Sequence, residues 1–172
     1  MSLPSLVRAS IFSAVAIGLG FMFMLVPNIE FISITVFLSG LTLGFSWGIA
    51  VGASSMLIYS SFNPLGSGLV YFTLLMSQIL SMSIIGILGA LAKKFLKDLS
   101  PRSQVIIASL FGLIGTLIYD ISTNLAYPIS AGYPLKETFT YAISGIFFTS
   151  IHLVSNTVIF SVVVPAYLRK IK

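Results

Sequence analysis

The sequence predicts an all-α integral membrane protein, and three of its properties support this prediction. First, 57% of the 172 residues are hydrophobic and only 8% are charged, whereas a typical soluble domain has about 25% charged residues. Second, the mean hydropathy is +1.08, and several apolar runs reach the length of about 18 residues that is typical of membrane-spanning helices. Third, the runs lack the short alternating segments that a membrane β-barrel would show.

The apolar runs predict six transmembrane helices in one domain, residues 1–172. The predicted spans cover residues 6–26, 29–43, 47–62, 69–92, 105–128 and 141–167. Turn-forming residues separate them, with Pro27 after the first span and a proline and two glycines in residues 63–68 after the third. The first run contains an A-x-A match at residues 14–16, but this lies in mid-run, so we expect a retained span rather than a cleaved signal peptide.

Basic residues predict the orientation of the six spans. Arg8, residues 93–102 and residues 169–172 fall on the same side of the membrane, and they hold all nine Lys and Arg residues except Lys136. Because positively charged segments stay in the cytoplasm, both termini are predicted to be cytoplasmic. The net charge of +5 is then an orientation signal, and we expect no binding of nucleic acid.

The motifs of common enzymes and metal sites are missing or misplaced. Without cysteine, the chain cannot form a disulfide, a thiolate metal site or a thiol nucleophile. Its one G-x-S-x-G match, residues 44–48, joins two predicted membrane helices instead of a strand and a helix. A single histidine makes poor metal chemistry, and no phosphate-binding G-x-x-x-x-G-K-[ST] motif occurs. We therefore expect no enzymatic activity, no cofactor and no metal, and any ATP hydrolysis must belong to another subunit.

The fifth predicted span carries the strongest functional signal. Asp120 and Asn124 are four residues apart and share one helix face, with Thr116, Thr123 and Tyr127 on or beside it. A carboxylate in a lipid-spanning helix costs roughly 2.5–3.5 kcal/mol on insertion scales, so it is by default a candidate functional residue. The alternative is that Asp120 ties neighbouring helices together.

Other polar residues have comparable depth in the membrane. At about 1.5 Å per residue, Asp120 and Gln78 lie roughly 9–13 Å below the outer ends of their spans. His152 and Asn156 are also four residues apart on one face. Gln78 is equally well explained by helix-to-helix hydrogen bonds, and His152 by packing, ligand contact, proton transfer or metal binding.

These residues predict a pocket open to the outside, formed by the last three spans and bordered by the outer loops. Glu30 adds an acid at the start of the second span, where capping of the helix is the simpler interpretation. The predicted substrate-binding residues are Asn28, Glu30, Asn63, Tyr71, Gln78, Tyr119, Asp120, Asn124, Tyr127, His152 and Asn156.

Small residues at helical spacing predict close helix packing in two spans. The third span has Gly48 and Gly52 four residues apart. In the first span the rows are Ala9 and Ser13; Ser10, Ala14 and Gly18; and Ala16 and Gly20. Packing within the bundle and docking to another subunit both explain the rows of the first span.

With these features, the chain resembles the S components of energy-coupling factor (ECF) transporters, which are six-helix, vitamin-binding membrane proteins. The resemblance covers essentially the full length in size, topology and placement of polar loops. Its local features are residues 37–44 (FLSGLTLG) with the following Trp47 and Gly48, residues 62–66 (FNPLG), and residues 119–124 (YDISTN).

The resemblance implies a function in the plasma membrane of a prokaryote, as one subunit of an importer. The S component binds a vitamin or vitamin precursor from outside beneath a gating loop, here residues 26–30 with residues 63–68. It then works with an ECF coupling subunit and two ATPase subunits. The family docks through two alanines four apart on the first span, and here the rows keep small residues without that exact pair.

Two questions stay open from the sequence. Asp120 and Glu30 favour a cationic or hydrogen-bond-donating ligand, whereas Lys136 in an outer loop would favour a carboxylate. The alternative function is a stand-alone small-solute channel or a proton-coupled carrier that uses Asp120 and His152.

Overall fold

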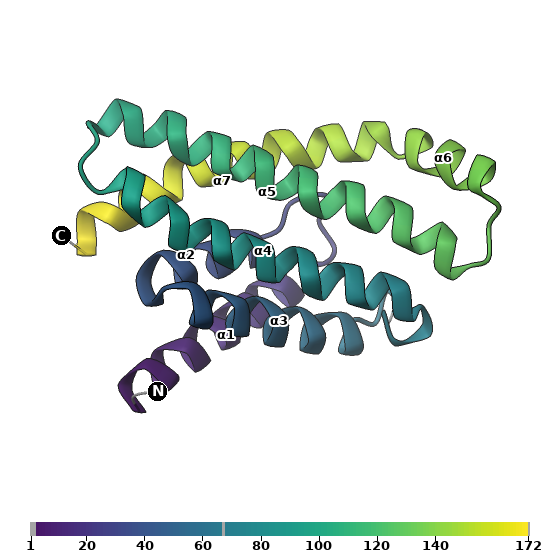
Figure 1. Cartoon of the computed structure of the whole chain (residues 1–172), viewed down its shortest axis with the longest axis horizontal. Helices are drawn as coiled ribbons and strands as arrows, with labels where there is room; N and C mark the ends of the chain where they lie inside the picture. The colour runs from purple at the N-terminus through teal and green to yellow at the C-terminus, as the bar shows by residue number, and fades with distance from the viewer. Residues whose placement is uncertain (1–2, 67, 172) are drawn as a thin grey trace.

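The computed structural model describes residues 3–66 and 68–171, and this part of the chain contains helices and connections but no strand. The α-helices are α1 (Leu3–Phe23), α2 (Ile32–Leu43), α3 (Phe45–Phe62), α4 (Phe72–Leu96), α5 (Pro101–Ser130), α6 (Leu135–Ser144) and α7 (Ile146–Ile171), with a 3-10 turn η1 (Gly68–Val70) before α4. The long helices run side by side, with the start of α1, the α4–α5 connection and the end of α7 toward one end and α6 at the other (Figure 1).

Four helices among the described residues, α1, α4, α5 and α7, are long and apolar enough to cross a membrane. The protein is therefore an all-helical, multi-pass membrane protein. The helix α3 has 18 residues. The helix α2 is apolar but has only 12 residues, fewer than the roughly 20 that cross a bilayer unaided.

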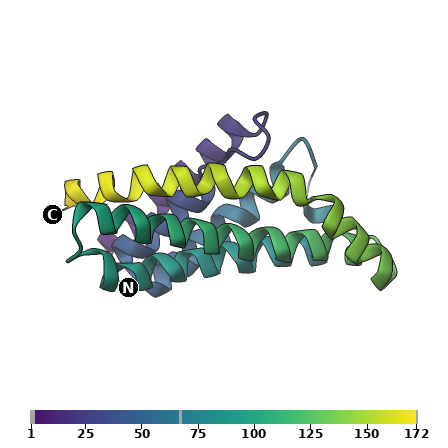
Figure 2. The same cartoon turned by 90° about the horizontal axis from the view of Figure 1, so that it is seen from above.

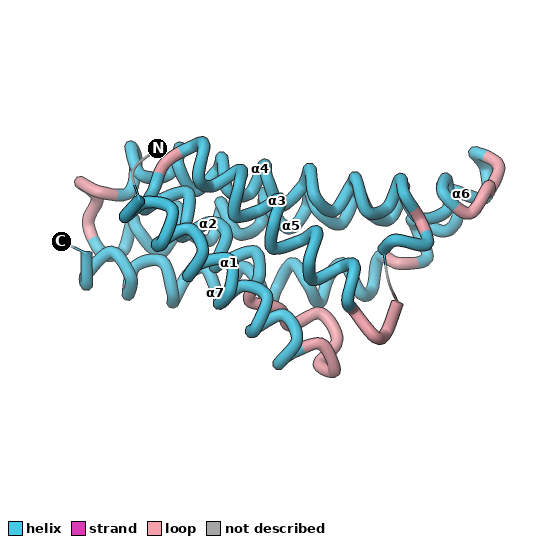
Figure 3. Tube along the Cα trace, turned by 90° about the horizontal axis from the view of Figure 1, so that it is seen from below, coloured by secondary structure: helices cyan, strands magenta, loops and turns pink. Residues whose placement is uncertain are grey.

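The structure differs from the predicted spans around α2. The helix α1 ends at Phe23 and α2 begins at Ile32, so the connection between them is longer than the turn at Pro27 predicted. We call residues 24–31 the covering loop. Figure 2 shows this loop standing out from the bundle, and Figure 3 shows it between the α4–α5 and α5–α6 connections, which lie at opposite ends.

The region after α5 also differs from the prediction. The predicted spans end at residue 128 and resume at residue 141, with an outer loop between them, but α5 continues to Ser130 and α6 begins at Leu135. Pro134 precedes the first turn of α6, which also contains Glu137, and both residue types favour a helix start. The helical stretch predicted for residues 141–167 is divided at Gly145, where α6 ends and α7 begins.

Glycines set the contacts among α2, α3 and α4. A Cβ atom on Gly40 or Gly48 would overlap the backbone carbonyl group of Gly86, and one on Gly52 would overlap the carbonyl group of Met82. The backbones therefore touch directly, as the small residues of α3 predicted. The contact buries α2 almost completely, since all residues from Ile32 to Leu41 are buried.

Aromatic packing joins this glycine-rich part to α5 and α7. Phe37 of α2 lies with its ring centroid 5.6 Å from that of Phe111 and 5.1 Å from that of Phe160. A Cβ atom on Gly112 of α5 would crowd the Phe160 side chain of α7. The close approach of α5 and α7 at this point fixes the relative positions of the polar residues farther along both helices.

The sequence match to a nucleophile elbow lies at the α2–α3 connection. Gly44 has φ 90°, a left-handed conformation that favours glycine, and Ser46 lies in the first turn of α3. The local structure is a tight turn between two helices.

Candidate functional site

Helices α5 and α7 and the covering loop bring five polar residues together. His152 Nδ1 donates to Asp120 Oδ1 at 2.8 Å. Asn156, one turn farther along α7, places its Nδ2 atom 2.9 Å from Glu30 Oε1, 3.0 Å from Thr116 Oγ1 and 3.0 Å from His152 Nε2. We call Glu30, Thr116, Asp120, His152 and Asn156 the polar cluster; all are buried except Glu30, which is half-buried.

The spacing of polar residues along the sequence explains the part of this arrangement that α5 and α7 contribute. Asp120 and Thr116 lie one turn apart on α5, and His152 and Asn156 lie one turn apart on α7, so each helix presents two polar groups on one face. Because α5 and α7 pack against each other, the two faces meet. Thr116 Oγ1 also donates to the Gly112 carbonyl oxygen at 2.8 Å, which leaves this hydroxyl as an acceptor for Asn156.

The covering loop supplies Glu30 and is attached to α7 at two points. One carboxylate oxygen of Glu30 accepts from the backbone N–H of Ser33 at 2.9 Å, and the other accepts from Asn156. The Asn28 carbonyl oxygen accepts from Ser155 Oγ at 2.5 Å. Glu30 therefore caps α2, as predicted, and in addition attaches the loop to the polar cluster.

The surroundings of Glu30 favour its ionised form. Burial alone would raise the pKa of the Glu30 carboxyl, but hydrogen bonding to His152 and its charge, together with hydrogen bonds from Ser33, outweigh burial and lower the pKa below its ordinary value. His152 Nε2 lies 3.7 Å from Glu30 Oε1. The loop thus presents a carboxylate to α7 at neutral pH.

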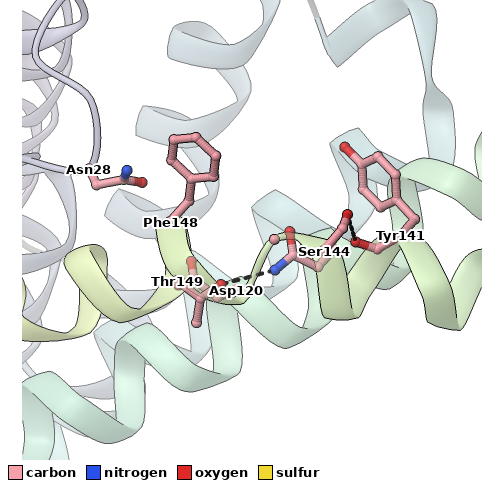
Figure 4. Close-up of a pocket in the computed structure, with 8 residues that line it drawn as sticks. Asn28, Asp120, Tyr141, Ser144, Phe148 and Thr149 are labelled. Carbon is pink, nitrogen blue, oxygen red and sulfur yellow. Dashed lines mark hydrogen bonds between the residues drawn. The ribbon is translucent and has the colours of Figure 1, made fainter.

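Two cavities of about 270 Å³ each border the polar cluster, and Asn28 and Asp120 line both of them. The first lies between α5 and the α6–α7 junction, and its other lining residues are Asn124, Tyr141, Ser144, Gly145, Phe148 and Thr149 (Figure 4). The second lies under the covering loop, against Gly20, Tyr59, Tyr119, Glu30 and His152. Asn28 and Asp120 therefore mark the border that the two small cavities share, which we call the partition.

Most of the predicted site residues lie at these cavities. Asn28, Glu30, Tyr119, Asp120, Asn124 and His152 line one or both, and Asn156 belongs to the polar cluster. Asn124 Nδ2 donates to Thr149 Oγ1 at 3.2 Å across the first cavity wall. Tyr127 stacks between Tyr71 and Tyr141, with centroid distances of 5.1 and 5.3 Å.

Tyr71 and Tyr127 line neither cavity, and the same holds for the two remaining predicted residues. Gln78 Oε1 accepts from Ser60 Oγ at 2.6 Å, which joins α4 to α3. Asn63 Oδ1 accepts from the backbone N–H of Leu65 at 2.9 Å and shapes the turn after α3. Neither lines the two cavities, but each also bonds to a tyrosine that lines the second cavity, Gln78 to Tyr119 and Asn63 to Tyr59. The helix α4 therefore supports the site without lining it.

Some residues that line the first cavity were not predicted from the sequence. Thr149 precedes His152 by three positions and Asn156 by seven, which is the spacing of one helix face, so this residue was detectable. Tyr141 and Phe148 could not be detected in this way. They lie on either side of the break at Gly145, and helical spacing does not continue across a break.

The small residues of α1 separate into internal and exposed groups. Ala9, Ala16 and Gly20 are buried, and a Cβ atom on Gly20 would crowd Ile32 and Tyr59. Ser13 Oγ lies 3.1 Å from Ser54 Oγ of α3. The remaining row, Ser10, Ala14 and Gly18, is exposed and is the part of the predicted docking surface that is free of internal contacts.

Comparison of the chain with protein families, with curated proteins and with solved structures finds no match. Among the described residues, no group of three or more His, Cys, Asp or Glu side chains has an arrangement that could hold a metal ion.

Proposed function

We propose that this chain is the substrate-binding subunit of an ECF-type importer, which captures a vitamin or vitamin precursor outside the cell and delivers it inward. The observation that supports this proposal most directly is the buried polar cluster between two cavities beneath the covering loop. Intramembrane ionisable groups are costly and usually functional, and small-molecule sites combine an apolar wall with few convergent polar groups.

The proposed topology has six membrane crossings, α1 to α5 and α7, with both termini cytoplasmic in the plasma membrane of a prokaryote. The basic residues that the structure describes, except Lys136, belong to the start of α1, to the α4–α5 region or to the end of α7, which lie toward the same end of the bundle (Figure 1). The short helix α2 is surrounded by its neighbours, and α6 lies outside the membrane core or at its surface. The positive end faces the cytoplasm.

In this proposal the covering loop acts as the gate. Its attachments, Glu30 to Asn156 and Asn28 to Ser155, are hydrogen bonds that can break individually. Each contributes on the order of 1 kcal/mol, somewhat more for the charged group. Displacement of Asn28 removes one side of the partition between the two cavities, which would join them into a volume within the usual range of about 300–1,000 Å³ for ligand pockets.

The partners proposed are an ECF coupling subunit and two ATPase subunits. The sequence has no motif for gripping a nucleotide phosphate, so energy must come from outside this chain. The exposed row Ser10, Ala14 and Gly18 would dock to the coupling subunit, because small side chains let a partner helix approach closely. Ser10 and Ala14 also line a groove of about 420 Å³ between α1 and α3.

Native mass spectrometry of the purified chain, with and without coexpressed coupling and ATPase subunits, tests this function. We expect a retained small molecule, a complex with the partners, and ATP-dependent uptake in liposomes that contain the complex. Replacing Ala14 by Leu should prevent assembly without loss of the retained solute. A chain that binds no solute and no partner would contradict the proposal.

A proton-coupled carrier is the second candidate, because His152 lies between two acids, 2.8 Å from Asp120 and 3.7 Å from Glu30. Such a chain of titratable groups suits proton transfer. This candidate requires solute flux in liposomes that contain this chain alone and a flux that follows an imposed pH gradient. Flux that appears only with the ATPase partners excludes it.

A further inference from the structure

Asp120 has a hydrogen-bond acceptor that the protein leaves unused. Its Oδ1 atom is paired with His152, whereas Oδ2 is buried and has no hydrogen-bond partner. The residue is only 7% exposed, and it lines both cavities. A buried carboxylate oxygen without a partner is unfavourable, so a donor that enters either cavity and reaches Oδ2 after a small shift of the Asp120 side chain would bind strongly.

The charges around Asp120 favour a positive ligand. Glu30 and Asp120 are two carboxylates beside a single imidazole, and neither cavity is lined by Lys or Arg. Even with a protonated His152, one negative charge remains uncompensated in the polar cluster. A cation close to a buried carboxylate is stabilised far more than in water, whereas a carboxylate or phosphate group would be repelled.

Aromatic rings complete the first cavity. Tyr141 and Phe148 line it on the side of α6 and α7 (Figure 4), and Tyr141 continues into a stack with Tyr127. Aromatic faces attract cations and stack on planar ligands. The cavity volume of about 270 Å³ is close to the lower end of the usual range of about 300–1,000 Å³ for ligand pockets, which suits a small molecule.

We infer that the ligand of this site is a small organic cation with an aromatic or other planar ring, whose protonated nitrogen or N–H group donates to Asp120. This inference rests on the proposed function as a solute-binding subunit and names the class of solute. It excludes a dicarboxylate, a phosphorylated compound and a large macrocycle. Tyr141 and Phe148 would hold the ring, and the covering loop would close over it.

Three matched probes test the inference with the purified full-length chain in detergent: phenethylamine, phenethyl alcohol and 3-phenylpropionate at neutral pH. They share a ring and a similar chain length but are cationic, neutral and anionic. Isothermal titration calorimetry should show phenethylamine binding at least tenfold more tightly than the alcohol, with no binding of the anion. Anion binding equal to or tighter than cation binding, or no binding of phenethylamine at millimolar concentration, would overturn the inference.

Asp120→Asn should weaken phenethylamine binding at least tenfold and abolish the preference over the alcohol. The control is Asp98→Asn, since Asp98 is exposed near the opposite end of the bundle, and its binding should equal that of the wild type. Thermal unfolding checks that Asp120→Asn is folded; should it be unfolded, the three-probe comparison on the wild type decides the question. Unchanged binding by folded Asp120→Asn would overturn the inference.

The identity of the solute retained during purification separates this inference from the proposed function. A retained anionic or uncharged solute, together with ATP-dependent uptake in the complex, rejects the cation while the importer function stands. Phenethylamine binding through Asp120 without any partner or uptake supports the cation site and rejects the importer.

Discussion

The helices α2, α3 and α4 meet through backbone, whereas α5, α7 and the covering loop meet through buried polar side chains. In the first region Gly40, Gly48 and Gly86 bring carbonyl groups against Cα atoms with no space for a methyl group. In the second, Asp120 and Asn156 each keep a buried oxygen without a partner. The first region has no space at these crossings, although Ser55 and Ser77 also keep unpaired buried hydroxyl groups. The second region borders two cavities and keeps an unpaired carboxylate oxygen and an unpaired amide oxygen.

Because of this difference in packing, the two regions suit different roles. Close backbone contact gains dispersion energy and has one arrangement, so the glycine region forms a rigid support. A polar cluster with unpaired acceptors stabilises the fold less than a filled apolar core would. We propose that ligand binding explains the presence of such a cluster inside a membrane protein, and the following predictions test this contrast.

The largest effect is expected in the glycine region. Gly86→Ala should destabilise the protein by about 3 kcal/mol, at the upper end of overpacking effects, because its Cβ atom would overlap the Gly48 carbonyl group. Thermal unfolding in detergent and size-exclusion chromatography measure the loss. Gly18→Ala is the matched control, since nothing lies within 4 Å of its Cβ position. An equal response of the two variants would show that the helices are not in backbone contact.

Asn156→Ala should have the next largest effect, about 2 kcal/mol, because one amide connects the covering loop, α5 and α7. The truncation leaves Glu30 and Thr116 without their shared donor. Denaturant titration in micelles gives the free energy of unfolding. The control is Thr157→Ala, at the neighbouring residue on α7. An Asn156→Ala variant as stable as the wild type would show that the polar cluster does not stabilise the fold.

Glu30→Gln should reduce stability by about 1.5 kcal/mol at neutral pH, in line with hydrogen bonds to charged groups. Because the folded-state pKa of Glu30 is lowered, its contribution is present above the ordinary glutamate pKa and is lost as the pH falls below it. Wild type and Glu30→Gln should therefore converge in unfolding temperature on acidification. Glu137→Gln, exposed on α6, should follow wild type at every pH; a constant gap for Glu30→Gln would contradict its charged role.

Ser155→Ala is expected to give the smallest effect, about 1 kcal/mol, through the loss of one hydrogen bond to Asn28. The better readout is the mobility of the loop. The chain has no cysteine, so Val26→Cys introduces a unique thiol in the covering loop. Its labelling by a maleimide should be several-fold faster in the Ser155→Ala background and unchanged with the control Ser161→Ala. Identical labelling rates in all backgrounds would show that Ser155 does not hold the loop.

The sequence predicted local features of this contrast well. The helical class, the close packing at Gly48 and Gly52, and the capping by Glu30 follow from periodicity and residue type, and the structure confirms them. The four-residue spacing of Asp120 with Asn124 and of His152 with Asn156 identified the faces on which α5 and α7 meet in the structure. These features depend on residues within one or two turns of each other.

Features that depend on helix rotation were not predictable in the same way. Gln78 had the depth of Asp120, yet it faces α3 and bonds to Ser60. The first cavity depends on the break at Gly145, which brings Tyr141 and Phe148 beside Asn124. Depth from a span end can be counted from the sequence, but the direction of a side chain around the helix axis is set by distant packing partners.

The shortness of α2 has a consequence for how a site arises in such a bundle. Its 12 residues rise roughly 18 Å, whereas the 25 residues of α4 rise roughly 38 Å. A truncated helix among full-length neighbours leaves a niche above its first turn, and Glu30 and Asn28 occupy that niche. Replacing the residues that precede Ile32 would then change the size of the cavity under the covering loop, while the glycine contacts of α2 stay intact. Under the proposed function, this junction is therefore the position at which to redesign solute preference.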